Sequence, residues 1–247
     1  MDQFSQKKYN LVQLGSEIAK NGFKTEKHII DKFNNWENDR DTKNWLIHMG
    51  YELNKIEKIN AKLLFGFKSD IKVVIKIKLK NEIISENVQV KLVSNQRGFN
   101  QVDKRWLKSY KQMWNIPEKI YQIFAYYTGE LKPYRQNTNN KKRMFANEFN
   151  EDEQKIFLNW IIFNKLQIIN DILKGSGENS VDWFLIVQKS VNTNIYLIKN
   201  IDEVIEYYLD SGEVVITKRG QLKLVKSQCK EKVVIVVARA LICCNLN

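Results

Sequence analysis

The run SDIKVVIKIKL, from Ser69 to Leu79, and the run NVQVKLV, from Asn87 to Val93, decide the fold that we predict for this chain. In the first run, apolar residues alternate chiefly with lysines at the period of two that is typical of a half-exposed strand: Val73, Ile75, Ile77 and Leu79. The second run repeats the alternation. Polar residues around Asn81 and Ser85 separate the two runs, so we expect neighbouring strands joined by a turn.

Outward from these strands, the apolar spacing predicts alternating helices and strands. The expected helices are Leu11–Phe33, in two pieces separated at Asn21-Gly22, Trp106–Trp114, Ile116–Tyr127, Glu151–Leu173, opened by Asn150 and closed by Gly175, and Ile201–Leu209. The expected strands are Val181–Lys189, Ile195–Ile198, Val214–Thr217 and Leu222–Val225. No repeat or long linker is visible. We therefore expect an α/β fold, with a mixed central β-sheet flanked by helices, in one domain over residues 1–247.

The composition favours a polyanionic partner. Forty Lys and Arg against 28 Asp and Glu give a formal net charge of +12, which attracts nucleic acid or an anionic membrane. Lys, Asn and Ile are all abundant, however, as a base-composition bias of the gene would also produce. The three cysteines have neither metal-ligand nor disulfide spacing, and neither a secretory signal nor an apolar run of ~20 residues is visible. These features predict a soluble, cytoplasmic protein that does not span a membrane.

Three side chains on the two central strands form a candidate catalytic group. If Asp70 begins one strand, then Gln89 and Lys91 on its neighbour lie on one face, because side chains two residues apart share a face. Metal-assisted phosphodiester cleavage needs hard oxygen ligands and a cation near the attacking water. We expect Asp70, the Gln89 amide oxygen and the Val90 carbonyl to bind Mg²⁺, and Lys91 to orient or activate water.

The same residues also fit a purely structural interpretation. Asp70 would then be a turn residue at a strand start, Gln89 an exposed polar residue of a strand, and Lys91 a solvated charge that protects a sheet edge. An Asp followed at variable distance by the motif x-x-Lys often occurs by chance, so the surrounding sequence has to decide between the two interpretations.

That surrounding sequence resembles a known family. The runs GFKSDIKV from Gly66 and NVQVKLVSNQRGFNQVDKRWL from Asn87 resemble the HinP-type restriction endonucleases, which have the PD-(D/E)xK nuclease core. Further similar runs extend the resemblance over about Leu11 to Leu224: NGFKTEKHIIDKF, TGELKPY, KKRMFANEF, LKGSG and DWFLIVQK. The family has glutamine where most of its superfamily has an acid, as at Gln89. It also brings a helical glutamate to the site, which makes Glu26 our candidate for a water-mediated or second-metal role; an ordinary surface charge is the alternative.

The resemblance implies a type II restriction endonuclease that makes Mg²⁺-dependent double-strand cuts at GCGC and leaves 5′-phosphates. It also implies a partner methyltransferase acting on the same site. A monomer and a homodimer both remain open. Two other functions remain open as well: a DNA-binding protein without catalysis, and a structure-selective repair nuclease with the same core.

A basic loop follows the candidate catalytic lysine. Arg97, Asn100 and Gln101 lie within ten residues of Lys91, and Gly98 permits close approach to a DNA groove. Arg can read guanine, and Asn or Gln can bond base edges, whereas contacts to phosphates alone would give affinity without specificity. The residues that we expect to contact DNA are Ser94, Asn95, Arg97, Asn100, Gln101, Lys104 and Arg105. Lys108, Lys111 and the cluster Lys141–Arg143 are expected at phosphates.

The C-terminal residues 226–247 depart from the family, whose members continue with a glycine-rich basic run similar to QRKGGD. One back-translation of Lys226 to Ala238, read two bases later, encodes VTVQRKGGDSGR. We therefore form the hypothesis that the natural reading frame is lost near Val225. The loss would replace a polar recognition strand by the apolar run Val233 to Val237, which favours aggregation.

Overall fold

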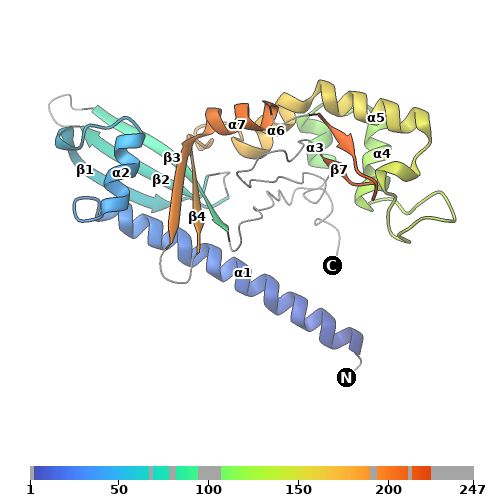
Figure 1. Cartoon of the computed structure of the whole chain (residues 1–247), viewed down its shortest axis with the longest axis horizontal. Coiled ribbons are helices and arrows are strands. Elements are labelled where there is room, and N and C mark those ends of the chain that lie inside the picture. Colours follow the sequence, from blue (N-terminus) through green and yellow to red (C-terminus); the bar gives the residue numbers. More distant parts are fainter. Residues whose placement is uncertain are drawn as a thin grey trace. The chain divides into compact units, whose positions relative to one another are not determined.

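The computed structural model describes residues 3–66, 69–77, 82–93, 107–189, 194–210 and 213–223 (Figure 1). The chain forms two compact units. Unit 1 comprises Met1–Asn95 and Lys174–Asp202, and unit 2 comprises Gln96–Leu173 and Glu203–Asn247. The single domain expected over residues 1–247 stays a prediction.

A mixed five-stranded sheet forms the centre of unit 1. Its strands lie in the order β1 (Ile56–Leu63), β2 (Ile71–Ile77), β3 (Glu82–Val93), β4 (Trp183–Gln188) and β5 (Ile195–Asn200). Only β3 and β4 are parallel, and the other neighbours are antiparallel. The predicted α/β fold with a mixed sheet and flanking helices is thereby confirmed. Ser85, expected in the turn, lies within β3 and pairs with Val74.

Strand β1 is absent from the sequence prediction, and its register explains why. The pairing of β1 with β2 shifts between Ile56 and Lys58. Because of this irregularity Ile56 and Ile59, three residues apart, are both buried, so the apolar residues do not alternate with a period of two. The short helix α2 (Arg40–His48) was also missed.

Helices α1 (Gln3–Asn34) and α2 cover one face of the sheet. Ile29 and Phe33 of α1 and Leu46 of α2 are fully buried in a cluster with the apolar side chains of the five strands. Asn34 at the end of α1 exchanges two hydrogen bonds with the main chain of Ala61 in β1, at 2.8 and 3.2 Å. The C-terminal part of α1 is therefore fixed to the sheet.

Helix α1 is continuous, so the predicted separation at Asn21-Gly22 is wrong. Gly22 is tolerated in the helix because a glycine inside a helix costs only about 1 kcal/mol relative to alanine. The Thr25 hydroxyl also donates to the Asn21 carbonyl at 2.8 Å, so this carbonyl has a side-chain partner within the helix. In Figure 1 the N-terminal half of α1 extends beyond the sheet of unit 1.

Unit 2 consists mainly of helices: α3 (Leu107–Met113), α4 (Glu118–Thr128), α5 (Glu151–Phe163), α6 (Lys165–Leu173) and most of α7 (Ile201–Asp210). Asn150 caps α5 as predicted, accepting a hydrogen bond from the Glu153 N–H at 2.8 Å. The single helix expected from Glu151 to Leu173 is instead bent by 61° between α5 and α6. At the bend, the Asn164 side chain donates to the Trp160 carbonyl at 2.7 Å, and this carbonyl also accepts the Asn164 N–H at 3.0 Å.

The short strands β6 (Val215–Ile216) and β7 (Leu222–Lys223) form a hairpin in unit 2. The Leu222 N–H donates to the hydroxyl of buried Tyr127 at 3.0 Å, and the Ala146 N–H donates to the Gly220 carbonyl at 2.8 Å. The hairpin is therefore fixed to α4 and to the segment before α5.

No single helix in the described ranges is both long and apolar enough to cross a membrane, although the bent pair α5 and α6 together has the required length and composition.

Candidate active site

Asp70 is held between two strands by its main chain and its carboxylate. Its N–H donates to the Val88 carbonyl at 3.1 Å, and its carbonyl accepts from the Leu64 N–H at 2.9 Å. Its Oδ2 accepts from the Val90 N–H at 2.7 Å. Asp70 therefore bonds to β3 on both sides of Gln89, and its carboxylate has a fixed position relative to that residue.

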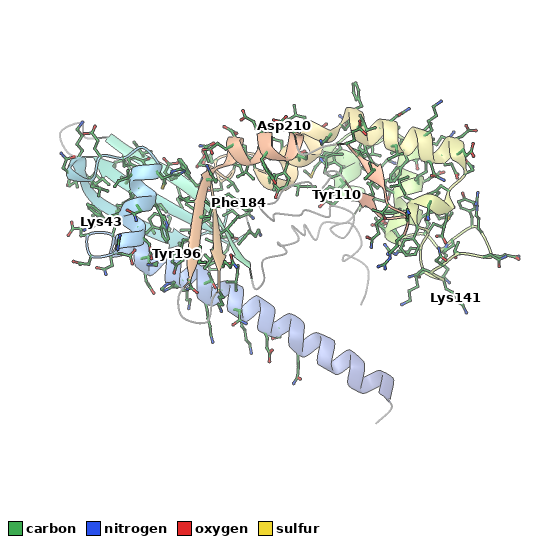
Figure 2. All side chains as sticks on the ribbon, viewed as in Figure 1. Lys43, Tyr110, Lys141, Phe184, Tyr196 and Asp210 are labelled. Carbon is green, nitrogen blue, oxygen red and sulfur yellow. The ribbon has the colours of Figure 1, made fainter. Side chains whose placement is uncertain are left out.

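Gln89 and Lys91 lie on β3, which is an interior strand of the sheet. They pair in parallel register with Phe184, labelled in Figure 2, and Ile186 of β4. Gln89 is only 3% exposed and Lys91 is partly buried. The interpretation of Gln89 as an exposed polar residue and of Lys91 as an edge charge is therefore wrong, because β3 has a neighbour on each side.

Glu26 of α1 lies within electrostatic range of the two charged side chains. Burial raises the pKa of Glu26, the negative charge of Asp70 raises it further, and the positive charge of Lys91 acts in the opposite direction. Glu26 comes from helix α1, Asp70 from the residue before β2, and Lys91 from β3, and the fold of unit 1 brings them together. A carboxyl group whose pKa is shifted by burial and by neighbouring charges is typical of a functional site.

Residues just before β4 hold the part of β3 that precedes Gln89 and Lys91. The Asn87 N–H donates to Asp182 Oδ2 at 2.8 Å, and the Asp182 N–H donates to the Asn87 carbonyl at 2.9 Å. The Asn87 side chain donates to the Glu178 carbonyl at 2.9 Å, and the buried Ser69 hydroxyl donates to the Asn179 carbonyl at 2.7 Å. The loop Glu178–Asp182, which we call the strap, therefore ties down the residue before Asp70 and the residue two before Gln89.

The sequence did not reveal the strap. Its bonds join residues that are 91 to 110 positions apart in the chain. The one available signal is the pair Gly175 and Gly177, whose positive φ values of 73° and 82° form the turns that lead into this loop.

The donor atoms at the site fit a hard divalent cation. Oxygens of Asp70, Gln89 and Glu26 belong to the classes that such a cation prefers, as does a main-chain carbonyl such as that of Val90. Across the ranges that the structure describes, no three His, Cys, Asp or Glu side chains gather in ligand geometry. A metal held here would therefore take amide and main-chain oxygens in addition to carboxylates, as the predicted ligand set does.

The predicted DNA-reading residues, from Ser94 to Arg105, lie outside the described residues. Of the residues expected at phosphates, Lys108 is exposed on α3. Lys111 bonds to Glu118 at 2.5 Å and lies 4.5 Å from the centre of the Tyr121 ring. Lys141, labelled in Figure 2, and Lys142 are exposed in unit 2, and Arg143 is partly buried. Three of these lysines are therefore directly accessible to a polyanion.

Comparison with known proteins gives the family. The model of the R.HinP1I restriction endonuclease family matches residues 49–234, about three quarters of the chain. The chain belongs to this family. It is a type II restriction endonuclease, a site-specific deoxyribonuclease that acts on DNA, and enzymes of this kind generally depend on a divalent metal. The predicted restriction-endonuclease-like fold is confirmed. No curated protein matches the chain.

The matched range includes Asp70, Gln89 and Lys91 but begins after Glu26. It ends ten residues beyond Leu224, where the resemblance was expected to stop, so part of the unusual C-terminal sequence is still included in the family match. The roles of the individual residues and the hypothesis of a lost reading frame stay predictions.

Proposed function

We propose that this R.HinP1I-type endonuclease makes Mg²⁺-dependent double-strand cuts at GCGC and leaves 5′-phosphates. The observation that carries the proposal is the arrangement in unit 1. Asp70 is bonded to β3 on both sides of buried Gln89, Lys91 follows two residues later, and Glu26 lies in electrostatic range. The choice of GCGC rests on the similarity of the run from Gln89 to Leu107 to the HinP-type family.

Each residue then has a distinct part in hydrolysis. Asp70, Gln89 and the Val90 carbonyl would hold the magnesium ion, which supplies Lewis acidity when bound. The Lys91 ammonium orients the attacking water and stabilises charge on the phosphate oxygens. Glu26, with its raised pKa, accepts a hydrogen bond from a water molecule or contributes to a second metal position. Attack at phosphorus with loss of the 3′ oxygen leaves the phosphate on the 5′ end.

The DNA contacts would come from the loop after β3. We assign base reading to Arg97, Asn100 and Gln101, with Ser94 and Asn95 nearby, and phosphate contacts to Lys104 and Arg105. This assignment rests on the residue types and on the family resemblance. The working unit is a monomer or a homodimer, and a methyltransferase acting on the same site would protect the host DNA in the cytoplasm.

The test is digestion of a plasmid of known sequence with Mg²⁺ and with a chelator, followed by sequencing of the ends. Cuts confined to GCGC that need the metal, with ends that ligate without prior phosphorylation, support the proposal. Cuts at another sequence would contradict the assigned specificity, and equal cutting in chelator would contradict the metal role. The Lys91→Ala variant is the control for a contaminating nuclease.

The expected loss of the reading frame near Val225 favours one second candidate, a disabled endonuclease that binds DNA without cutting it. A parallel digestion with a chain whose reading frame is restored near Val225 separates the two. If only the restored chain cuts, the present chain is the disabled form. If neither cuts, but the chain shifts DNA with a strong salt dependence that ignores Mg²⁺, the function is binding alone. Cutting of junctions or flaps in preference to intact duplex would indicate the repair nuclease.

A further inference from the structure

Two exposed phenyl rings stack on each other in unit 1. Phe23 of α1 and Phe65, in the turn after β1, have ring centres 6.1 Å apart and ring planes 26° apart. Phe23 is 43% exposed and Phe65 is 67% exposed. Rings of this size are usually placed in the core, because burial of a phenyl side chain is strongly favourable. We call this exposed stack the Phe23–Phe65 pair.

The Phe23–Phe65 pair adjoins the candidate active site through both of its residues. Phe23 lies three residues before Glu26 on α1, and residues at this spacing are neighbours on a helix surface. Phe65 directly follows Leu64, whose N–H donates to the Asp70 carbonyl at 2.9 Å. The stack therefore borders the residues assigned to the chemistry, and DNA positioned for cutting has to pass close to it.

The charges around the Phe23–Phe65 pair suit a polyanion. The Lys27 ammonium lies 6.0 Å from the centre of the Phe23 ring. Lys24, beside Phe23 in the chain, and Lys62 of β1 are both exposed. DNA presents apolar sugar and base surfaces between phosphates, so apolar rings with nearby ammonium groups match its chemistry. An apolar surface of two rings next to lysines is less suited to a second copy of this strongly basic chain.

We propose that the Phe23–Phe65 pair contacts the deoxyribose and base of the nucleotide next to the phosphate that is cut, with Lys27 near an adjacent phosphate. The proposal rests on the proposed endonuclease function and adds an apolar contact surface to it. Aromatic side chains are used in this way because sugars, and base faces at a partly unstacked step, are apolar whatever the sequence. It strengthens DNA binding without contributing to the choice of GCGC.

The test compares Phe65→Ala with Phe163→Ala, which removes a phenyl ring that is 89% exposed on α5 of unit 2. Fluorescence anisotropy in chelator gives the dissociation constant for a GCGC duplex, and single-turnover cleavage at rising protein concentration gives the maximal rate. We expect Phe65→Ala to weaken binding by about 5- to 30-fold, the usual effect of losing one aromatic contact to nucleic acid. Phe65→Tyr should restore most of the binding, and Phe163→Ala should have no effect.

A double-mutant cycle locates the contact on the DNA. Abasic sites are placed one at a time at the positions around the cut, and each duplex is measured with the unsubstituted protein and with Phe65→Ala. At one position next to the cut phosphate, the abasic site should remove most of the penalty of Phe65→Ala. Additive effects at every position would overturn the proposal, as would equal binding by the Phe65→Ala and Phe163→Ala variants.

Two other results have separate meanings. If Phe65→Ala halves the mass of the free protein in solution and leaves DNA binding unchanged, the stack contacts a second copy and the proposal is wrong. If the unsubstituted chain binds but does not cut, the proposed function fails, whereas the anisotropy measurements still decide whether the Phe23–Phe65 pair contacts DNA.

Discussion

Replacement of Asp182 by alanine should loosen the part of β3 that carries the candidate site residues Gln89 and Lys91. The Asp182 carboxylate accepts the Asn87 N–H at 2.8 Å, and Asn87 is only 5% exposed. Without the carboxylate this N–H loses its partner at a place that water reaches poorly, which costs about 1–3 kcal/mol of the free energy of unfolding. Asp182→Asn keeps an acceptor oxygen, so it should lose about 1 kcal/mol or less.

The matched control is Asp202→Ala, which also removes a carboxylate from unit 1. Asp202 is 66% exposed and bonds to Lys174 at 2.7 Å, and an exposed ion pair of this kind contributes only about 0–1 kcal/mol. Urea unfolding of the four proteins gives the comparison. Equal stability of Asp182→Ala and Asp202→Ala would show that the strap bond contributes nothing.

The cleavage assay separates a positioning role from a merely structural one. Gln89 lies two residues after Asn87, so a shift of Asn87 should move a proposed metal ligand. The single-turnover rate of Asp182→Ala should therefore fall more at limiting than at saturating Mg²⁺, while that of Asp202→Ala should match the unsubstituted chain. A loss of rate that is the same at every Mg²⁺ concentration would refute the reasoning.

The remaining predictions concern both units. Lys91→Ala should abolish cleavage and keep DNA binding, measured by plasmid digestion and anisotropy; unchanged turnover would remove Lys91 from the mechanism. The pKa of Glu26 is raised in the folded state, so ionisation of Glu26 lowers the free energy of unfolding. This loss develops as the pH rises from the unfolded to the folded pKa, and it remains at higher pH. Glu26→Gln should therefore raise the urea midpoint in chelator at pH 7 but not at pH 3, and lower the cleavage rate. Gly220→Ala should lose more than about 2 kcal/mol in thermal unfolding, because φ is +71° and the new Cβ would overlap Asn147.

The sequence predicted the elements whose local pattern agrees with their final environment. Strand β2 alternates regularly, and Asn150 is followed three residues later by Glu153, so the strand and the start of α5 were found from the residues alone. The elements missed are those in which a local irregularity changes the pattern. The shifted register near Ile56 conceals β1, and the bend at Asn164 divides an apolar pattern that continues from α5 into α6.

The candidate site was also predictable only in part. The residue types and spacing of Asp70, Gln89 and Lys91 suggested the group, and the family-like sequence around them decided in its favour. The structure places Asp70 directly before β2 and bonds it to β3 on both sides of Gln89. The strap was not predictable, because the partner of Asn87 is 95 residues away and depends on the parallel pairing of β3 with β4. The Phe23–Phe65 pair likewise joins a helix to a turn after a strand that the sequence did not reveal.

The parallel pairing of β3 and β4 separates, along the chain, the residues proposed for the chemistry from those proposed to read bases. Parallel neighbours need a long crossover connection, and here residues 94–182 between the two strands contain the whole first segment of unit 2, Gln96–Leu173. The bonds that fix Asp70 and Asn87 come from Leu64, Val88, Val90 and the strap, all within unit 1. These bonds use neither residues 226–247, where we propose that the reading frame is lost, nor the loop proposed to read bases. A defect caused by the loss of the reading frame should therefore weaken DNA binding or broaden its specificity, and it should leave the maximal rate on bound DNA unchanged. A defect in the strap should instead lower the rate on bound DNA and leave DNA binding unchanged.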